Sequence, residues 1–535
     1  MDGYTFLVDA HACMEYLFHR SCPPLVGSVP VVSRLKRNPR DARPGRLLFS
    51  PVQSSYLRAL WGTILLVGVI QKKSMAELAA LLERMDSSSY DVLELRLDAC
   101  ADLDPVALAG LALPLPAIFT LRCKAEGGLY PKGEEERLEM LAALMRLKPA
   151  YLDIEASVAP ERTAYIRSLS PDTKIILSQH DFNRTPIALR SILDSMMQKA
   201  GGAVYKIAAY ARSGLDALRM LVFCKEQKAR GVPLIGICMG EDGISTRVLA
   251  PVAHTGFCYC PVDEASAPGQ LDAATLREVY NFASLDGDTA VYGLLGDPVG
   301  QSIGHVYHNE RNASSACNAV YVKWRITGGE TRQALALLRA LGVAGLSITM
   351  PLKEAVMPFL AAIDETGRAI GAVNTLKAGP DGFSATNTDG AGALDSVDEI
   401  RSWRGKTVVV LGAGGAAKAV IHEADRRGAV LAIYNRTPGK KLPGASSALA
   451  TRAFSRLGEL RTKPYDVIIN ALPFGVSLAF EEIPFQAGAL ALDLSYGKPS
   501  AFLRAAGAAG CRVMDGAGMF AGQARLQRIF WELPA

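Results

Sequence analysis

Two residues of the chain have the types and surroundings of a nucleophile and its acid–base partner. Lys206 lies in the apolar run AVYKIA, and His180 ends the run KIILSQH. A lysine held among apolar neighbours and near other cations has a lowered pKa, so its amine can attack a ketone carbonyl. The iminium that forms withdraws electrons from the adjacent carbon, and a histidine can move the proton there. Spacing alone leaves open an ion pair between Lys206 and a carboxylate such as Glu94, and a structural, hydrogen-bonded role for His180.

Charged side chains also lie in or directly after the neighbouring apolar runs. They are Glu94, Arg96, Asp98, Arg122, Asp153 and Glu155. One charged residue at a strand end is unremarkable, because long basic side chains extend to water there. With His180 and Lys206 these residues occupy five runs, and we expect their side chains to meet on one face.

A glycine-rich segment in the second half has the spacing of a dinucleotide site. GAGGAAKA (412–419) follows the apolar run TVVVLG and opens a helical pattern, which is the context such a site requires. The glycines let a pyrophosphate approach the helix N-terminus. The next run, LAIYN, is followed by Arg436, which favours the 2′-phosphate of NADP; a surface arginine is the alternative. The expected cofactor contacts are Gly412, Ala413, Gly414, Gly415, Ala416, Asn435, Arg436 and Thr437.

A second acid–base pair is expected earlier in the sequence than this glycine-rich segment. SITMPLKEAV carries Thr349 and Lys353, and TNTDGAG carries Asn387 and Asp389. A Lys–Asp pair can deliver a proton to the alkoxide that develops as a hydride arrives. The alternative is a surface ion pair, which is common and contributes little.

The elements that must position these residues follow from an alternation of apolar and helical segments. Eight apolar runs are separated by apolar residues at three- and four-residue steps, as in SMAELAALLERM, and the seventh connection is the least helical. This alternation predicts a (β/α)8 TIM barrel, whose catalytic residues lie at the carboxyl ends of the strands. The runs are 64–70, 92–98, 117–122, 151–155, 174–180, 203–208, 234–240 and 256–260.

The rhythm changes after Asn281, so the predicted fold class is α/β, with a second, two-lobed α/β region following the barrel. Expected strands there are 291–296, 320–326 and 407–412. The predicted domains are a basic, poorly ordered extension at 1–58, the barrel at 59–284, a substrate-binding lobe at 288–403 with a closing helix from about 518–533, and a Rossmann NADP-binding lobe at 404–517.

Composition narrows the class of protein. A length of 535 residues implies two or three domains, and a net charge of +5 gives no reason to expect nucleic acid. The ten cysteines and seven histidines are scattered, which predicts reduced thiols and no metal site. The first residues lack the basic start of a signal peptide, and the apolar run 59–70 is shorter than the roughly 20 residues of a membrane span. We therefore expect a cytoplasmic protein without a membrane segment.

The first half resembles a known enzyme family. The matching motifs are ELRLD (94–98), TLRCKAEGG (120–128), SQHDFNRTP (178–186), VYKIA (204–208), MGEDGISTRV (239–248) and ASAPGQ (265–270), and they resemble type I 3-dehydroquinate dehydratase. The resemblance implies a Schiff base on Lys206 and proton transfer by His180, with Glu126 orienting it and no metal. It further implies substrate contacts from Glu94, Arg96, Arg122, Arg247, Ser266 and Gln270.

The second half resembles shikimate dehydrogenase. The motifs are YGLLGDPVGQS (292–302), SITMPLKEA (347–355), IGAVNT (370–375), NTDG (387–390), GAGGAAKA, NRT (435–437), INALPFGV (469–476) and GMFAGQA (518–524). The resemblance implies that Lys353 and Asp389 are catalytic. It implies substrate contacts from Ser302, Thr349, Asn374, Tyr496 and Gln523.

One departure from the dehydrogenase pattern bears on substrate choice. The family reads Ser-x-Ser-Pro where this chain has Ser302, Ile303, Gly304 and His305. A hydroxyl that would face the substrate carboxylate is missing, and the hydrogen bond lost is worth about 1.5–3 kcal/mol unless His305 replaces it. A milder departure is Ala-Leu-Pro at 471–473, where the family favours Ala-Thr-Pro.

The resemblances imply a shikimate-pathway enzyme with two activities. The barrel would dehydrate 3-dehydroquinate, and the dehydrogenase would reduce the product to shikimate with NADPH. Because Gly304 leaves room for a bulkier ring carbon, a quinate dehydrogenase is the main alternative. A non-catalytic metabolite sensor is less favoured, since all four catalytic residues are present. The expected partners are small-molecule substrates, and the sequence leaves the oligomeric state and substrate channelling open.

Overall fold

The computed structural model describes residues 64–200, 203–265, 267–397, 400, 402–439, 451–473, 476, 478–497 and 500–535. The described chain forms two compact units. The barrel unit comprises residues 64–364, 373–386 and 528–535, and the glycine-turn unit comprises 365–372 and 387–527. The extension predicted for residues 1–58 lies outside the described residues.

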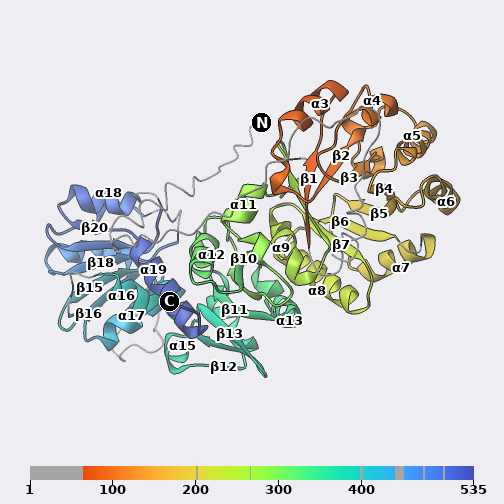
Figure 1. Ribbon diagram of the computed structural model, residues 1–535. Coiled ribbons are helices and arrows are strands. Elements are labelled where there is room, and N and C mark those ends of the chain that lie inside the picture. The colour runs from red at the N-terminus through yellow and green to blue at the C-terminus, as the bar shows by residue number, and fades with distance from the viewer. Residues whose placement is uncertain are drawn as a thin grey trace. The chain divides into compact units, whose positions relative to one another are not determined.

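Eight parallel strands in the barrel unit confirm the predicted barrel (Figure 1). Their order in the sheet is β7-β6-β5-β4-β3-β2-β1-β8, so β1 to β7 follow one another in sequence order and β8 pairs with β1, which leaves the barrel nearly closed. The strands are β1 (Leu65–Ile70), β2 (Val92–Arg96), β3 (Ala117–Thr120), β4 (Tyr151–Glu155), β5 (Lys174–Asp181), β6 (Val204–Tyr210), β7 (Leu234–Met239) and β8 (Phe257–Pro261). Each overlaps a run expected from the sequence.

Helices surround these strands, as Figure 1 shows for α3 to α8. Polar residues begin several of them: the Ser74 side chain accepts a hydrogen bond from Glu77 N, and the Asp104 carboxylate accepts from Val106 N and Ala107 N. The connection between β7 and β8 holds only the short α9 and α10, as expected. The helices are α3 (Met75–Arg84), α4 (Pro105–Ala109), α5 (Glu134–Arg146), α6 (Pro160–Ser168), α7 (Leu189–Lys199), α8 (Gly214–Ala229), α9 (Ile244–Val248), α10 (Ala250–Ala253) and α11 (Ala273–Glu278), with 3₁₀ turns η1 (Ser87–Ser89), η2 (Leu97–Ala99), η3 (Lys124–Glu126), η4 (Glu241–Gly243) and η5 (Phe282–Ser284).

The barrel strands bury both faces, which explains their continuous apolar sequences. The side chains that fill the interior form one cluster: Leu65, Val67, Val69, Val92, Ile118, Tyr151, Ile176, Ala208, Ile235, Ile237, Phe257 and Tyr259. The opposite faces of the strands pack against the surrounding helices in a larger cluster that includes Leu93, Leu95, Phe119 and Leu141. Glu94, Asp153 and Lys206 are buried charged residues within these otherwise largely apolar strands.

A second sheet follows the barrel in the same unit, in the order β10-β9-β11-β13-β14-β12. Helix α13 packs on α8 of the barrel, and Lys225 Nζ on α8 donates a 2.8 Å hydrogen bond to Leu341 O at the end of α13. The elements are β9 (Ala290–Gly296), α12 (Gly304–Ser314), β10 (Ala319–Arg325), η6 (Gly328–Glu330), α13 (Thr331–Leu341), β11 (Val343–Ile348), α14 (Leu352–Ala355), η7 (Met357–Phe359), β12 (Ala362–Ile363), β13 (Thr375–Gly379) and β14 (Gly382–Thr386). We call this part the strand lobe.

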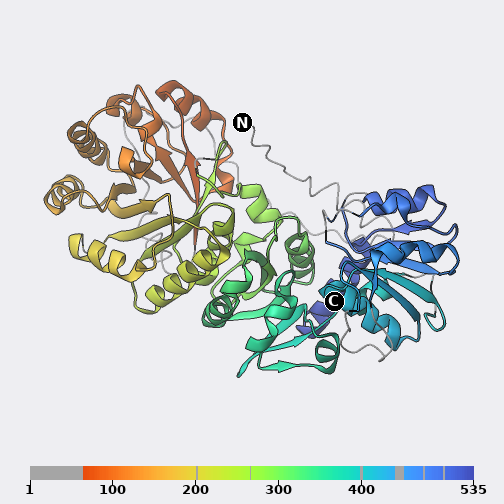
Figure 2. The ribbon, with the colours of Figure 1, turned by 180° about the vertical axis from the view of Figure 1, so that it is seen from behind.

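The glycine-turn unit is a doubly wound parallel sheet in the order β17-β16-β15-β18-β19-β20, seen from two sides in Figures 1 and 2. The sheet order reverses at β15, after which the glycine-rich turn comes, as in dinucleotide-binding folds. The elements are α15 (Glu365–Ile370), α16 (Asp389–Asp395), β15 (Thr407–Leu411), α17 (Gly415–Arg426), β16 (Val430–Asn435), β17 (Arg452–Ala453), η8 (Phe454–Arg461), β18 (Val467–Asn470), η9 (Phe480–Glu482), β19 (Leu490–Asp493), α18 (Ala501–Ala508), β20 (Arg512–Met514) and α19 (Ala517–Phe530).

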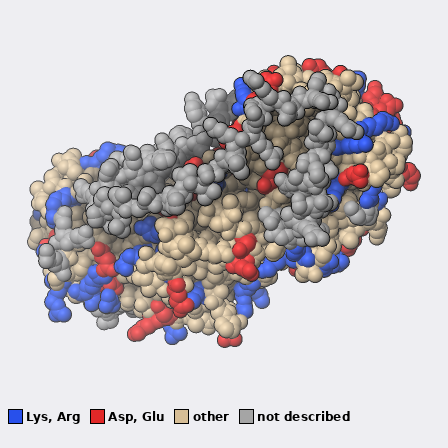
Figure 3. Space-filling model, in the orientation of Figure 1, with Lys and Arg blue, Asp and Glu red and all other residues tan. Residues whose placement is uncertain are grey.

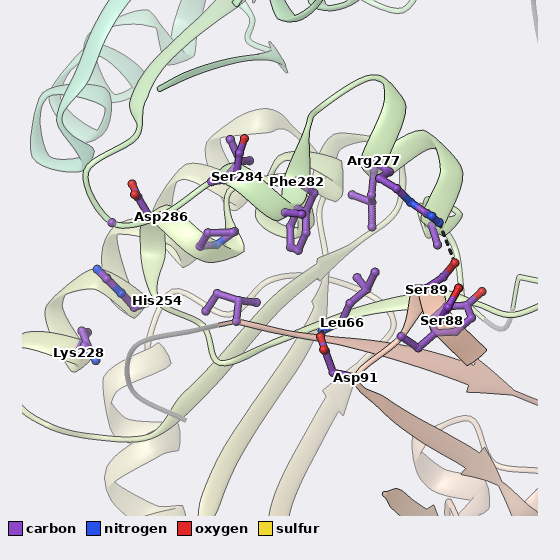
Figure 4. Close-up of a pocket in the computed structure, with 18 residues that line it drawn as sticks. Leu66, Ser88, Ser89, Asp91, Lys228, His254, Arg277, Phe282, Ser284 and Asp286 are labelled. Atoms are coloured by element: carbon purple, nitrogen blue, oxygen red, sulfur yellow. Dashed lines mark hydrogen bonds between the residues drawn. The ribbon is translucent and has the colours of Figure 1, made fainter. Parts of the chain in front are cut away.

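A cavity of about 550 Å³ lies at the amino ends of the barrel strands (Figure 4). Its wall includes Asp91 before β2, Lys228 at the end of α8, His254 before β8 and Arg277 on α11. None of the candidate catalytic side chains lines it, so the cavity is separate from the chemistry expected at the carboxyl ends. On the described surface in Figure 3, acidic and basic side chains are interspersed. In the described part of the chain, helices that are long and apolar enough to cross a bilayer are absent.

Candidate active sites

The Lys206 ammonium lies inside the barrel, beside two carboxylates and an aromatic ring. Its Nζ is 3.3 Å from Asp153 Oδ2 on β4 and 3.5 Å from Glu94 Oε1 on β2. It also lies 4.3 Å from the centre of the Tyr259 ring on β8. Of the two interpretations that the spacing leaves open, the structure contains the ion pair with Glu94. The carboxylates offer a place for the proton that must leave the amine before it can attack a carbonyl.

His180, at the end of β5, is held by Glu126 of η3. Glu126 Oε2 accepts a 2.9 Å hydrogen bond from His180 N and lies 3.0 Å from His180 Nδ1. Burial, followed by the charges of Arg122 and Lys206, holds the pKa of His180 well below its ordinary value. Burial also raises the pKa of Glu126, to about 7. The imidazole is thus neutral, with Nδ1 fixed by Glu126 and Nε2 left to exchange a proton.

A buried network of charges fixes Arg122 at the centre of the site. Its Nη2 lies 3.0 Å from Asp153 Oδ2, and its Nη1 lies 3.1 Å from Glu155 Oε1 and donates a 2.7 Å hydrogen bond to Ser178 Oγ. Burial opposes the charge of this guanidinium, but Asp153 and Glu155 outweigh it and raise the pKa of Arg122. Arg137 on α5 extends this network, since its Nη1 lies 2.9 Å from Glu155 Oε2.

Two further arginines differ in what they already bind. Arg96 is paired with Asp98 through two 2.9 Å hydrogen bonds. Arg247 on α9 is buried, and its Nε has no hydrogen-bond partner in the described residues. A buried, unmatched guanidinium is unfavourable unless an anion joins it. Arg247 therefore presents a buried guanidinium that an anion would stabilise.

The segment after β8 that carries Ser266 and Gln270 is described except at residue 266. Gly240 N donates a 3.1 Å hydrogen bond to Pro268 O, and Gln270 Oε1 accepts one of 3.2 Å from Ala267 N. These contacts bring Gln270 to the carboxyl end of β7. Ser266, a predicted substrate contact, lies outside the described residues.

In the strand lobe, four predicted residues gather at the carboxyl ends of β9 and β11. Ser302 follows β9, Thr349 follows β11 and donates its N–H to Leu295 O, and Lys353 lies on α14 with its carbonyl accepting from Val373 N at 2.8 Å. Asn374 is buried beside them, and its carbonyl accepts a 2.7 Å hydrogen bond from Ile348 N. The sheet topology thus brings together one lysine and three polar side chains.

Gly304 and His305 begin α12 beside Ser302. A Cβ on Gly304 would lie 3.3 Å from Ser302 Oγ and 3.5 Å from the Tyr321 ring, so space for a serine is nearly present. Burial and then the charge of Lys323 lower the pKa of His305 to about 3, against a hydrogen bond with the Ser302 backbone. His305 Nδ1 is buried and unpartnered among the described residues. A neutral ring that donates its other N–H to a backbone carbonyl leaves Nδ1 as an acceptor, which weighs against His305 as the missing donor.

In the glycine-turn unit, the turn after β15 has the shape of an anion site. Gly412 has a φ of 112°, a conformation that favours glycine, and its N–H donates to Tyr434 O. Gly414 caps the 12-residue α17, with no atoms within 4 Å of a Cβ built on it. Arg436 and Thr437 are exposed at the end of β16, and Asn435 Nδ2 donates a 3.2 Å hydrogen bond to Thr437 O. These residues fit a pyrophosphate at the helix N-terminus and a further phosphate beside Arg436.

The same unit gathers the remaining predicted residues around α19. Asp389 is buried, and its N–H is donated to Asn387 Oδ1 at 3.0 Å. Thr388 Oγ1 donates a 3.2 Å hydrogen bond to Gln523 O, and the Tyr496 ring lies 5.2 Å from that of Phe520. Asp389, through its neighbour Thr388, and Tyr496 are therefore both held next to α19, the helix that carries Gln523.

Comparison with known proteins gives the family. The chain matches the model of type I 3-dehydroquinase over residues 68–286 and that of the shikimate dehydrogenase substrate binding domain over 294–376. It is 34% identical over 480 residues to the chloroplastic bifunctional 3-dehydroquinate dehydratase/shikimate dehydrogenase of Arabidopsis thaliana, covering 83% of this chain and 78% of the relative. The chain belongs to this bifunctional family.

Two other relatives support the same family assignment. The shikimate biosynthesis protein AroDE of Chlamydia pneumoniae is 32% identical over 451 residues, covering 82% of this chain and 90% of the relative. The shikimate dehydrogenase (NADP(+)) of Moorella thermoacetica is 36% identical over 259 residues, covering 45% of this chain and 88% of the relative. The barrel is thus a type I dehydroquinase domain, and the part of the chain that follows it is a shikimate dehydrogenase, which confirms both resemblances.

Within the dehydratase barrel, sequence reasoning missed some of the residues that touch the site. Asp153 and Glu155 were visible as charged strand-end residues, but the sequence assigned them no role. The partners Ser178, Arg137 and Tyr259 had no distinguishing signal, because serine in a strand, arginine on a helix and an aromatic residue in a barrel are all common. Their part in the site follows only from the register of neighbouring strands.

The raised pKa of Glu126 generates a prediction about pH. Glu126 is ionised above about pH 7 and protonated below it, and only the carboxylate accepts the Nδ1–H of His180 strongly. We expect dehydratase kcat to rise with pH through about 7. Glu126→Gln should lower the rate by about tenfold or more and remove this inflection. Initial rates across this pH range measure both effects.

The control is Glu161→Gln, which changes an exposed carboxylate on α6. It should leave the rate and the pH profile as in the unmodified enzyme. An inflection near pH 7 that persists in Glu126→Gln would refute the assignment.

Proposed function

We propose that the enzyme converts 3-dehydroquinate to 3-dehydroshikimate through a Schiff base on Lys206 and then reduces that product to shikimate with NADPH. The observation that carries the first half is the buried Lys206 ammonium beside two carboxylates, with the neutral His180 at the next strand end. The second half is supported by the cluster of Ser302, Thr349, Lys353 and Asn374 at one sheet edge.

In the dehydratase step, Glu94 takes a proton from Lys206, and the free amine adds to the ketone with loss of water. His180 Nε2 then removes the proton from the carbon next to the iminium. The C–H electron pair forms a C=C bond to the iminium carbon, and the C=N π electrons move onto nitrogen, which gives an enamine. As the nitrogen pair forms the C=N bond again, the enamine C=C electrons form the new C=C bond to C1, and the C1 hydroxyl leaves as water with the proton held by His180. Water hydrolyses the iminium and restores Lys206.

Substrate orientation in this step is assigned to the arginines. Arg247 binds the ring carboxylate, because among the arginines described at this site its buried guanidinium is the one without a carboxylate partner. Glu94, Arg96 and Arg122 bind ring hydroxyls, with Gln270 and Ser266 closing over the substrate. Arg122 is fixed by its acidic neighbours, so it can recognise hydroxyls without rearranging.

In the dehydrogenase step, NADPH when bound supplies the hydride that adds to the ketone carbon. Lys353 and Asp389 carry the proton that the developing alkoxide takes up. Ser302, Thr349, Asn374, Tyr496 and Gln523 bind the ring acid. The cofactor contacts are those of the glycine-rich turn together with Asn435, Arg436 and Thr437, as the NADP(+) dehydrogenase of Moorella thermoacetica leads us to expect.

Two broader expectations belong to the same proposal. The functional domains run over 59–284, 288–403 and 404–517, with the C-terminal helix closing the second. The protein acts in the cytoplasm on small molecules; the eight described cysteines are free thiols, and seven of them are buried.

A quinate dehydrogenase remains the second candidate, and a specific observation favours it. Gly304 is buried at the start of α12 and offers no hydroxyl next to Ser302, so the ring acid has more room there. The metabolite-sensor alternative has no such support, because none of the proposed catalytic residues has been replaced. The chain retains Lys206, His180, Lys353 and Asp389.

Covalent trapping tests the Schiff base. Sodium borohydride added with 3-dehydroquinate should reduce the iminium and leave a mass adduct on the peptide that contains Lys206. Lys206→Met should lose the adduct and the dehydratase activity together. The matched control is Lys174→Met, at the opposite end of the barrel, which should retain both. An adduct-free Lys206 in active enzyme would refute the mechanism.

Restoring the missing hydroxyl tests the choice of ring acid. Gly304→Ser should lower KM for shikimate by roughly tenfold, because a hydrogen bond to a charged group contributes about 1.5–3 kcal/mol. Any activity on quinate should fall, since the added side chain fills the space beside Ser302. Steady-state rates on both acids measure this, with Gly304→Ala as the control for bulk without the hydroxyl. Equal or better rates on quinate in the unmodified enzyme would overturn the shikimate assignment.

Removing Arg436 tests the cofactor. Arg436→Ala should raise KM for NADP by about tenfold and leave that for NAD nearly unchanged, because the lost partner is the 2′-phosphate. Arg404→Ala, an exposed arginine before β15, is the matched control. Equal losses with both cofactors would contradict this role.

A further inference from the structure

The dehydratase barrel is hydrogen-bonded to the strand lobe at the carboxyl end of β7. Arg325, the last residue of β10, donates from Nε to Asp242 Oδ1 at 2.9 Å and Oδ2 at 3.2 Å, and its Nη2 also contacts Asp242 Oδ2. Asp242 lies in η4 of the barrel, directly after β7. The same Nη2 donates to Arg212 O, in the loop after β6. Two barrel loops therefore hold one arginine of the dehydrogenase by paired, charge-assisted hydrogen bonds.

Lys323 lies two residues before Arg325 on β10, so its side chain points to the same face of the sheet. Its Nζ donates to Gly300 O at 3.2 Å and to Ser302 O at 3.4 Å. Burial lowers the pKa of Lys323, and the charge of Glu241 in η4 of the barrel acts in the opposite direction. Glu241 Oε1 is also close to this loop, 3.6 Å from a Cβ built on Gly300. The lysine thus joins β10 to the loop that carries Ser302, and Glu241 of the barrel lies close to the same loop.

The loop also has contacts of its own: Asp297 N donates a 2.9 Å hydrogen bond to Met350 O, Val299 packs against a buried cluster, and His305 is hydrogen-bonded to the Ser302 backbone. Residues 297–303 connect β9 to α12 without belonging to a helix or strand. Within it, Ser302 N donates to Val299 O at 3.2 Å, and Ser302 Oγ accepts from Gly304 N at 3.2 Å. Gly304 has no side chain to add a contact. A substrate-binding hydroxyl on such a loop needs its backbone fixed from outside.

We propose that Lys323 is a positioning residue for the dehydrogenase: it fixes the backbone of the Ser302 loop, and the barrel holds it there through Glu241 and the Asp242–Arg325 pair. The dehydratase barrel is then a structural part of the neighbouring substrate site, and the fusion of the two domains has a mechanical consequence. The proposal rests on the role of Ser302 in binding the ring acid.

The decisive experiment compares steady-state kinetics of full-length variants. Lys323→Met should raise KM for shikimate by about tenfold, because two hydrogen bonds from a charged donor are lost. It should change kcat and KM for NADP by less than about twofold, since Lys323 touches neither the reacting atoms nor the glycine-rich turn. Lys323→Arg should recover part of the affinity, and dehydratase kinetics should stay unchanged.

A second variant reaches the loop from the barrel side. Asp242→Asn weakens the paired hydrogen bonds to Arg325. It should therefore raise KM for shikimate, as Lys323→Met does, but by a smaller factor. If Lys323→Met does not fold, as judged by a thermal melt, Asp242→Asn and Lys323→Arg still test the proposal.

Matched controls lie elsewhere on the contact between barrel and strand lobe. Ser213→Ala removes the Ser213 Oγ–Glu330 Oε1 hydrogen bond of 2.6 Å, and Lys225→Met removes the one to Leu341 O. Neither touches the Ser302 loop, so both should leave KM for shikimate unchanged. Equal increases in these controls would overturn the proposal, because the effect would then belong to the domain contact in general.

Ser302→Ala separates this proposal from the one on which it rests. If Ser302→Ala leaves KM for shikimate unchanged, the substrate role of Ser302 fails. If Ser302→Ala raises KM while Lys323→Met and Asp242→Asn do not, the substrate role stands and the positioning role of Lys323 is refuted.

Discussion

The dehydratase half depends on a balance of charge inside the barrel, where water is excluded and an unpaired ion is very unfavourable. Asp153 is the centre of this balance, since it contacts Lys206, Arg122 and the Ser178 hydroxyl at once. Burial favours its neutral form, but Arg122 and Lys206 outweigh burial and hold its pKa below the ordinary value. The cations of the site are therefore fixed before a substrate arrives, and catalysis requires little rearrangement of the protein.

Each arginine described at this site has a carboxylate partner, with one exception. Arg122 has Asp153 and Glu155, and Arg96 has Asp98, whereas Arg247 is buried without such a partner among the described residues. In the proposed function a ring carboxylate completes the balance, so the same electrostatic rule accounts for the fixed cations and for the proposed place of the anionic group. His180 remains neutral among these cations, as its proposed role of general base requires.

The dehydrogenase half uses a different constraint, the geometry of parallel sheets. The strand ends of β9 and β11 bring Ser302, Thr349 and Lys353 to one edge of the strand lobe. In the glycine-turn unit, the turn between β15 and α17 leaves open space over Gly414 for a phosphate. Side chains here are placed by where strands end, and the barrel adds a contact of its own through Asp242.

Much of this was determined by the sequence itself. The (β/α)8 barrel, the dinucleotide turn and the residues Lys206, His180, Lys353 and Asp389 follow from hydrophobic period, glycine spacing and family motifs, because these are local properties of the chain. Only the tertiary structure decided which charges pair. Asp153 became the partner of Lys206 through the alignment of β4, β5 and β6, and Arg325 met Asp242 although 83 residues separate them. Such contacts depend on strand register and domain packing, which no local pattern specifies.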